Sequence, residues 1–229
     1  MEFLTGLTPE ETLELEELLD ASRIGTEVRV RGAVHTIRDM GELSFVVLRK
    51  RDGLLQCIFE EGTTDYAVKD LREEMAVEIS GVLEEDARAP HGIEIRAREV
   101  KVFGRPYEAP PLPIGKWKLN TSLEAKLNYR STALRNVRER AKFRIQEGIV
   151  RGFRDFLYSQ HFTEIHTPKI GSKGAEGGSN VFKLDYFHRP AVLAQSPQLY
   201  KQMMVGVFER VFETAPVFRA EKHNTKRHL

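Results

Sequence analysis

The sequence of 229 residues contains a single cysteine, almost no net charge and no long apolar run. The one cysteine, Cys57, excludes an intrachain disulfide and is typical of a reducing compartment, so we expect a cytoplasmic protein. No apolar stretch approaches the roughly 18 residues that a membrane-spanning helix needs. The first twenty residues are acidic and lack the apolar centre of a signal peptide. The sequence therefore predicts a soluble globular protein.

The charge balance says little about binding partners. Lysine and arginine number 35 against 34 aspartate and glutamate, which leaves a net charge of +1. Basic residues nevertheless cluster at 29–51 and at 130–142, and a partner responds to such a patch rather than to the total. Nucleic-acid binding is one interpretation of these clusters, and solvated protein faces are the other.

Short strands are predicted over most of the first hundred residues. Five segments alternate apolar and polar residues and are separated by glycines; they span 27–34, 43–50, 54–61, 76–85 and 93–103. Before them, residues 8–19 predict a short helix that Thr8 caps, with Pro9 at its first position and Glu11 completing a capping box. Residues 63–74 predict a second helix, between the third and fourth strands. This order is typical of a small Greek-key barrel of the OB type.

A proline-rich connector follows the barrel. Residues 105–116 hold four of the ten prolines, which favours an extended, semi-rigid linker. Beyond it, apolar residues at four-residue spacing predict one amphipathic helix over 133–160; they are Val137, Ala141, Ile145, Ile149 and Phe153. Strands are expected at 161–170 and 210–221, and a strand running into a helix at 191–205. We therefore predict an α+β multidomain protein with three regions, 1–104, 105–132 and 133–229.

Two segments of the last region suggest an amino-acid site. Gln198 and Lys201 lie three residues apart near a helix start that follows Ser196, so an amide and an ammonium would share one face. Such a pair near a helix N-terminus predicts a grip for a small carboxylic acid, with an exposed helix start as the alternative. The glycine-rich loop 171–180 carries Glu176 and matches neither the Walker pattern nor the dinucleotide fingerprint. It is a surface loop unless that carboxylate closes over an amine.

The terminal segment FRAEKHNTKRHL, residues 218–229, suggests a phosphate site. Arg219 and Glu221 lie two apart on an expected strand and so face the same side. An arginine fork suits a phosphate or a carboxylate. Arg227 and His228 follow on a loop without aromatic residues, which suits a triphosphate better than single-stranded nucleic acid. A solvated basic loop is the alternative. We find no cysteine-based metal pattern and no Ser-His-Asp signature.

The order of these parts carries a family resemblance. A barrel, a hinge, HFTEIHTPKI, an EGG loop, QSPQLYKQ and FRAEKHNTKRHL together resemble aspartyl-tRNA synthetase of the archaeal and eukaryotic kind, a class II enzyme of subclass IIb. The resemblance runs from about Thr26 to Leu229. It implies that residues 133–229 are the first part of a class II antiparallel-sheet catalytic domain, with motif 1, the flipping loop and the start of motif 2. The chain would then be cut within motif 2, before motif 3 and the Mg²⁺ ligands, and would be inactive alone.

The resemblance also implies how ATP and its Mg²⁺ are used. This family activates aspartate by attack on the α-phosphate of ATP and then transfers it to tRNA. Arg219 matches the motif 2 arginine that holds the α-phosphate and the aspartate carboxylate. Glu221 matches its acidic partner near ATP or the tRNA end. Arg227 and His228 match loop positions close to the outer phosphates.

An aspartate pocket and a dimer interface are implied in the same way. Lys201 would face the side-chain carboxylate of aspartate, beside Ser196 and Gln198. Glu176 matches the loop glutamate that closes over the α-amino group. HFTEIHTPKI resembles motif 1, with Pro168 as its proline, so we expect a homodimer.

For the barrel, the resemblance implies contacts with tRNA. Arg38, Phe45 and Gln56 match positions that meet the anticodon, where Phe45 would stack on a base and Gln56 would hydrogen-bond one. Plain core packing is the alternative for Phe45. His35 and Pro90 align with sites where enzymes that discriminate tRNA-Asp carry Trp and Lys. The pair resembles non-discriminating enzymes, which also charge tRNA-Asn, although some eukaryotic relatives carry histidine at the first site too.

Two other functions stay open at the level of sequence. The first is that of asparaginyl-tRNA synthetase, an enzyme related to aspartyl-tRNA synthetase. It fits less well, because a pocket for the neutral side chain of asparagine does not need the cation of Lys201. A truncated, non-catalytic tRNA-binding paralogue would keep the barrel and half of the catalytic domain. The amino acid that is activated separates the first of these from the aspartate enzyme.

Overall fold

The computed structural model describes residues 12–106, 108–174 and 180–221. The chain divides into two compact units, Met1–Ala141 and Lys142–Leu229, and each is described by itself. No helix of the described residues combines the length and the apolar character needed to cross a membrane.

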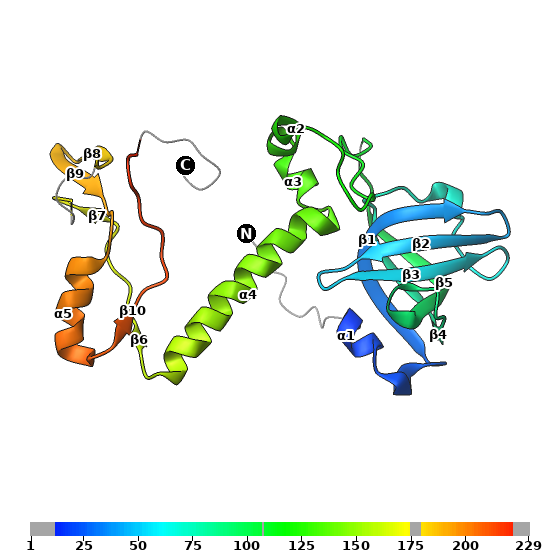
Figure 1. The fold of residues 1–229 in the computed structure, drawn as a ribbon. Coiled ribbons are helices and arrows are strands. Elements are labelled where there is room, and N and C mark those ends of the chain that lie inside the picture. Colours follow the sequence, from blue (N-terminus) through cyan, green and yellow to red (C-terminus); the bar gives the residue numbers. More distant parts are fainter. Residues whose placement is uncertain (1–11, 107, 175–179, 222–229) are drawn as a thin grey trace, which may run out of the picture. The chain divides into compact units, whose positions relative to one another are not determined.

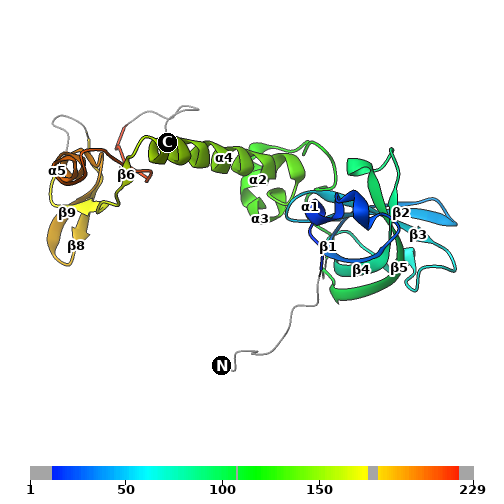
Figure 2. The ribbon, with the colours of Figure 1, turned by 90° about the horizontal axis from the view of Figure 1, so that it is seen from below.

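The first unit contains a closed five-stranded barrel with the strand order β1-β2-β3-β5-β4 (Figures 1 and 2). The strands are β1 Glu27–Asp39, β2 Leu43–Arg49, β3 Leu54–Glu60, β4 Ala76–Glu85 and β5 Ile93–Gly104. Strands β3 and β5 pair in parallel, and the other pairs are antiparallel. The OB-type barrel that the alternating pattern predicted is confirmed.

Alternation places one row of each strand in the barrel core. Val30, Leu48 and Ile79 are completely buried, and each such side chain stabilises the fold by about 1.5–3 kcal/mol. Leu15 and Leu18 of helix α1, Leu15–Leu18, add to the same core. Barrel and N-terminal turn therefore share one hydrophobic cluster.

Two helices predicted for this unit differ from the structure. The helix expected over 8–19 is the single turn α1, which begins after Glu14 because the Leu13 amide donates to the Arg29 carbonyl of β1 (3.0 Å). Thr8, Pro9 and Glu11 lie outside the described residues. The helix expected over 63–74 is wrong. Only a 3₁₀ turn, η2 Val68–Asp70, forms there, and the Asp65 amide donates to the Arg98 carbonyl of β5 (2.8 Å) instead of to a helical partner.

Two further 3₁₀ turns, η1 Ala21–Arg23 and η3 Pro90–Gly92, flank barrel strands. After the barrel come the short helices α2, Leu123–Asn128, and α3, Arg130–Ala133, and the long helix α4, Val137–Ser159. The single helix expected over 133–160 is thus interrupted at Asn136. The side-chain oxygen of Asn136 accepts from the amides of Arg138 (3.1 Å) and Glu139 (3.2 Å), which starts a new helix there.

The second unit combines short strands with one helix. Strands β6, Thr163–Glu164, and β10, Val211–Phe212, pair in parallel. Strands β7 Ile170–Gly171, β9 Arg189–Leu193 and β8 Lys183–Tyr186 form an antiparallel sheet in the order β7-β9-β8. Helix α5, Gln198–Phe208, follows β9 as predicted. The strands expected at 161–170 and 210–221 are much shorter, because Thr167 bonds the side chain of Glu213 rather than its backbone.

Helix α4 keeps its apolar stripe at the surface of this unit. Ile145, Ile149 and Phe153 are 63%, 67% and 50% exposed. At its C-terminal end, Phe153 and Tyr158 pack edge-on against Phe212 of β10, with ring centroids 6.1 and 5.4 Å apart. The helix is therefore anchored to the short strands at one end.

Candidate functional site

The barrel carries a pocket of about 510 Å³ on the face of β1, β2 and β3. His35, Arg38, Gln56 and Pro90, four of the residues with expected tRNA roles, line this pocket. The remaining lining residues are Thr36, Val47, Leu54, Arg88, Ala89, Gly115, Lys116, Trp117 and Val137. The structure thus brings together residues that lie as far as 102 positions apart in sequence (His35 to Val137, 137 − 35).

Strand register explains why these side chains converge. Arg38 lies opposite Phe45 in the β1–β2 pair, and Val47 lies opposite both Thr36 of β1 and Gln56 of β3. Side chains that face each other across a ladder point to the same side of the sheet. Phe45 is half-buried and sits two residues before Val47, on the same face of β2. It therefore extends the face that bears the pocket.

The amide of Gln56 is held in one orientation. Its Nε2 donates to Oε2 of the buried Glu94 at 2.8 Å, and a charge-assisted bond of this kind is strong. Because the nitrogen is directed at Glu94, the amide oxygen is oriented as an acceptor. Gln56 is thus a fixed hydrogen-bonding group in the wall of the pocket.

A β-bulge positions His35. The β1–β2 register shifts between Val34 and Thr36, so that His35 is the extra residue. Bulges re-aim neighbouring side chains, and this one keeps Val34 in the core while Thr36 and Arg38 face the pocket. His35 is 4% exposed, so most of its ring is packed inside the wall rather than displayed on the surface.

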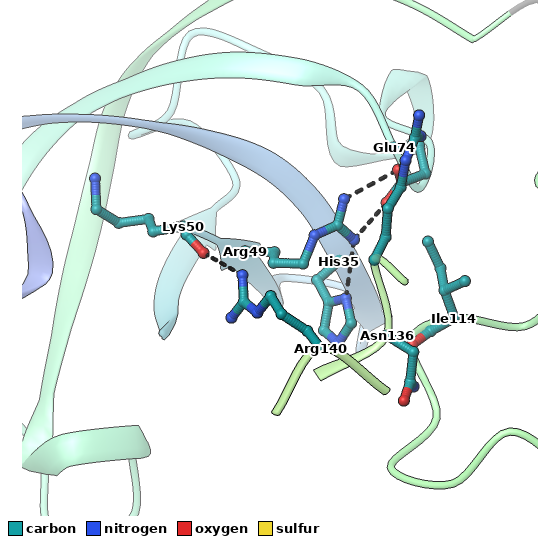
Figure 3. Close-up of polar contacts among 8 residues, drawn as sticks. His35, Arg49, Lys50, Glu74, Ile114, Asn136 and Arg140 are labelled. Carbon is teal, nitrogen blue, oxygen red and sulfur yellow. Dashed lines mark hydrogen bonds and ion pairs between the residues drawn. The ribbon is translucent and has the colours of Figure 1, made fainter. Parts of the chain in front are cut away.

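Arg49 lies between His35 and Glu74 (Figure 3). Its guanidinium binds both oxygens of Glu74 at 2.5 and 3.0 Å and approaches Nδ1 of His35 at 3.4 Å. Burial, and then the charge of Arg49, lower the pKa of His35 below its usual value. Burial alone would raise the pKa of Glu74. Hydrogen bonds from Arg49 and from Arg135 (2.6 Å) outweigh this effect and lower the pKa of that carboxyl. A neutral histidine and an ionised glutamate result.

The linker is fastened onto this side of the barrel. Asn136, 1% exposed, donates from Nδ2 to the carbonyls of Ile114 (2.9 Å) and Lys116 (2.6 Å). Between them, Gly115 lies so close to β1 that a Cβ there would be 2.5 Å from Cγ2 of Thr36. Arg140 of α4 donates to the carbonyl of Lys50 at 2.9 Å (Figure 3). The segment at 114–117 is therefore a fixed part of the pocket wall.

The second unit holds the candidate amino-acid site at the start of α5. Oγ of Ser196 accepts from the amide of Gln198 (3.2 Å), which orders the turn before the helix. Ser196 and Lys201 are half-buried, whereas Gln198 is exposed. The predicted placement of Gln198 and Lys201 in the first turns of one helix is thus observed.

Three segments that the resemblance singles out meet beside this helix start. The Phe218 amide donates to the carbonyl of Ala194 (2.9 Å), and the Ala220 amide donates to that of Asn180 (3.1 Å). Arg219 therefore lies between Phe218, which is bound to Ala194, and Ala220, which is bound to Asn180 at the end of the glycine-rich loop. Residues 213–221 do not form a regular strand, although these two backbone hydrogen bonds pair the segment with Ala194 and Asn180. Arg219 and Glu221 are exposed. Glu176, Arg227 and His228 lie outside the described residues.

A partly buried ion pair, in which Glu213 is the buried partner, holds the segment HFTEIHTPKI beside β10. Glu213 accepts from the Thr167 amide (2.8 Å), from its hydroxyl (2.9 Å) and from Nζ of Lys169 (2.8 Å). Burial alone would raise the pKa of Glu213. The hydrogen bonds from Lys169 and Thr167 outweigh this effect, so the pKa of the carboxyl is lowered. Pro168 sits between the two donors and is exposed.

No group of three His, Cys, Asp or Glu side chains among the described residues could hold a metal ion. The carboxylates near the candidate amino-acid site do not form a cluster of that size. The described residues therefore supply no all-protein cluster of this kind.

Among the charged and aromatic residues that line the barrel pocket, sequence reasoning missed Arg88, Lys116 and Trp117. Arg88 is paired with Asp86 (2.7 Å). Trp117 was recognisable as the single tryptophan of the chain. Its position in a proline-rich linker gave no indication that the linker folds back onto the barrel.

Comparison with known proteins gives matches to both units. A family model described as tRNA synthetases class II (D, K and N) matches residues 122–229, and one described as OB-fold nucleic acid binding domain matches residues 28–103. Aspartate–tRNA(Asp/Asn) ligase of Thermus thermophilus is 45% identical over 208 residues, 91% of this chain and 48% of the relative. Aspartate–tRNA(Asp) ligase of Pyrobaculum aerophilum is 41% identical over 209 residues, 90% and 48%.

Among solved structures, asparaginyl-tRNA synthetase from Pyrococcus horikoshii with asparaginyl-adenylate superposes with a TM-score of 0.85 at 30% identity. The match covers 96% of this chain and 50% of that one. The chain spans about half the length of the curated relatives it matches.

Proposed function

Residues 122–229 belong to the class II tRNA synthetases of the D, K and N group and residues 28–103 to the OB-fold nucleic acid binding domains, and from this premise we propose that the chain acts in an aspartate–tRNA ligase. The reaction is attachment of L-aspartate to tRNA through an aspartyl-adenylate formed with ATP. The observation that carries this proposal is the meeting of Asn180, Ala194 and Phe218–Ala220, which sets Arg219 beside the start of α5.

The chemistry proposed for this site is charge neutralisation and positioning, since in-line attack on a phosphate needs no protein nucleophile. Arg219 holds the α-phosphate and the aspartate α-carboxylate with its planar fork, and Glu221 lies on the same side of the extended segment. We extend the proposal to Arg227 and His228 at the outer phosphates. ATP and Mg²⁺ are the expected cofactors, and the ion would neutralise phosphate charge when bound.

Lys201 is the residue that we propose selects aspartate. Its ammonium is half-buried on the first turns of α5, where it can pair with a second carboxylate. The adjacent Ser196 and Gln198 would supply hydrogen bonds, and Glu176 would close over the α-amino group. Asparaginyl-tRNA synthetase is the second candidate because the structural match named above is such an enzyme. The curated relatives at 45% and 41% identity favour aspartate.

The barrel pocket supports tRNA as the second substrate. Arg38 and Gln56 line it and Phe45 extends its face, so we propose that a splayed anticodon loop binds there. His35 and Pro90 line the same pocket, which supports a role for both in tRNA selection. We propose that tRNA-Asn is charged as well as tRNA-Asp.

The exposed stripe on α4 supports an oligomer. Ile145, Ile149 and Phe153 present apolar surface that a soluble protein normally covers. We propose a cytoplasmic homodimer through motif 1, with Pro168 at its interface. Sedimentation of the protein that carries this chain measures the mass; a monomer would contradict the proposal.

Aminoacylation tests the proposed function directly. The protein that carries this chain is incubated with ATP, radiolabelled aspartate and transcripts of tRNA-Asp and tRNA-Asn in separate reactions. Charging of both supports a non-discriminating enzyme, and charging of tRNA-Asp alone leaves a discriminating one. If neither transcript is charged with aspartate, the aspartate assignment is contradicted.

A further inference from the structure

Trp117 is an exposed aromatic side chain in the wall of the barrel pocket. It is 72% exposed and is the single tryptophan of the chain. An indole carries a large apolar surface that folded proteins tend to cover. It comes from the linker, whereas Arg38 and Gln56 in the same pocket come from barrel strands.

The backbone immediately before Trp117 is held in place by contacts at residues 114–116. Asn136 binds the carbonyl of Lys116, the residue immediately before Trp117, at 2.6 Å and that of Ile114 at 2.9 Å. Between them, a Cβ on Gly115 would lie 2.9 Å from the His35 carbonyl and 2.5 Å from Thr36, so this position needs glycine for its close approach to β1. The indole is thus displayed from a fixed segment, which lowers the entropy that a ligand must remove.

The chemistry of the pocket fits a nucleotide in single-stranded RNA. Gln56, oriented by Glu94, offers a hydrogen bond to a base edge. Arg38, Arg88 and Lys116 are cationic groups suited to phosphate. A flat ring is the remaining requirement, because bases bind proteins largely by stacking on aromatic faces.

We propose that Trp117 is a stacking platform for an RNA base, supplied by the linker and not by the barrel. The proposal rests on the proposed function, since it adds a residue to the tRNA surface of the same pocket. Phe45 lies on the β2 face that extends beyond Val47, a pocket residue. A strand that crosses this face would meet Phe45 and Trp117 with different bases.

The single tryptophan makes the test direct. The 229-residue chain is titrated with a fluorescein-labelled anticodon stem-loop of tRNA-Asp, and anisotropy of the label gives the Kd. In a parallel titration with unlabelled RNA, tryptophan emission is excited at a wavelength that tyrosine hardly absorbs. We expect quenching that follows the same binding curve. A fully paired duplex of the same length, which has no splayed base, should cause none.

Three variants separate stacking from folding. Trp117→Ala should raise the Kd about tenfold, and Trp117→Phe, which keeps an aromatic face, should recover most of the affinity. Phe103→Ala is the matched control, because Phe103 is 51% exposed on β5 of the same unit and does not line the pocket. It should leave the Kd unchanged. Circular dichroism confirms that each variant is folded.

The outcomes distinguish this inference from the proposed function. If the stem-loop binds and Arg38→Ala weakens it, but Trp117 emission and the Kd of Trp117→Ala do not change, the stacking role is overturned and the tRNA surface stands. If tryptophan emission of the free chain is already that of a buried indole, another part of the protein covers it and the inference also fails. If the stem-loop does not bind at all, both proposals fall.

Discussion

The side-chain amide of Asn136 lies 2.6 Å from the carbonyl oxygen of Lys116 and joins the start of helix α4 to the linker. The same side chain caps that helix through its oxygen, which accepts from Arg138 and Glu139. One buried residue therefore both begins α4 and fixes the segment that displays Trp117.

Replacing Asn136 by alanine should remove both functions. The helix cap and the buried carbonyls of Ile114 and Lys116 lose their partners, so we expect the free energy of unfolding of the first unit to fall by about 3 kcal/mol. Chemical denaturation measures this. Asn136→Ser keeps a cap but not the two donors, so its free energy of unfolding should lie between those of the wild type and the alanine variant. Equal stability of all three proteins would show that the clamp does not matter.

Replacing Gly115 by alanine should lift the linker off β1. The new methyl group would lie 2.5 Å from Thr36 and 2.9 Å from the His35 carbonyl, and overpacking of this kind costs about 1–3 kcal/mol. Gly104→Ala is the control, because nothing lies within 4 Å of a Cβ at that position. Thermal unfolding should show a loss for the first variant alone. The emission maximum of Trp117 should shift in that variant too.

Stability should fall on acidification through the range where free histidine titrates. The folded pKa of His35 is lowered by burial and by Arg49, so below a pH of about 6.5 the unfolded chain takes up a proton that the folded chain does not. The stability that the lowered pKa of His35 contributes is fully present above the pKa of the unfolded chain. It is lost as the pH falls toward the pKa of the folded chain. The slope for one proton is at most about 1.4 kcal/mol per pH unit.

His35→Asn should flatten this slope between pH 7 and 5.5, as measured by denaturation at each pH. Glu74 has a lowered pKa as well, but its contribution is lost only below the usual range of a glutamate, near pH 4.5. The two effects are therefore separate in pH. An unchanged slope in the histidine variant would contradict the buried, neutral state of His35.

Glu213 should be needed to hold HFTEIHTPKI against β10. Its side chain is 2% exposed and binds Thr167 and Lys169, so Glu213→Gln should destabilise the second unit by about 2 kcal/mol. Hydrogen exchange at the Thr163 and Ile165 amides, which bond to Arg210 and Phe212, should accelerate. Glu147→Gln, which breaks an exposed pair with Arg151 on α4, should have an effect below about 0.5 kcal/mol. Equal effects would argue against a structural role for Glu213.

The barrel was predictable because each strand is half-buried and so alternates at period two. The prediction for β1 stopped at Val34, where the bulge at His35 breaks the alternation, although the strand continues to Asp39. The helix expected at 63–74 failed because Asp65 and Thr64 bond to β5. Such tertiary bonds override local propensity and leave no periodic signal.

The pocket was predictable in part. Arg38 and Gln56 were named from the resemblance, and the strand register brings them to one face. Trp117 was missed because its place depends on contacts with Asn136 and β1, which are distant in sequence. The short strands β6 and β10 have the predicted order but not the predicted length, since Thr167 and Glu213 pair through a side chain.

The most direct test of the aspartate assignment is amino-acid activation. ATP–pyrophosphate exchange by the protein that carries this chain is measured with aspartate and with asparagine, for the wild type and for Lys201→Met. We predict exchange with aspartate, little with asparagine, and loss of the aspartate reaction in the variant. Exchange with asparagine and none with aspartate would contradict the proposed function and the role of Lys201.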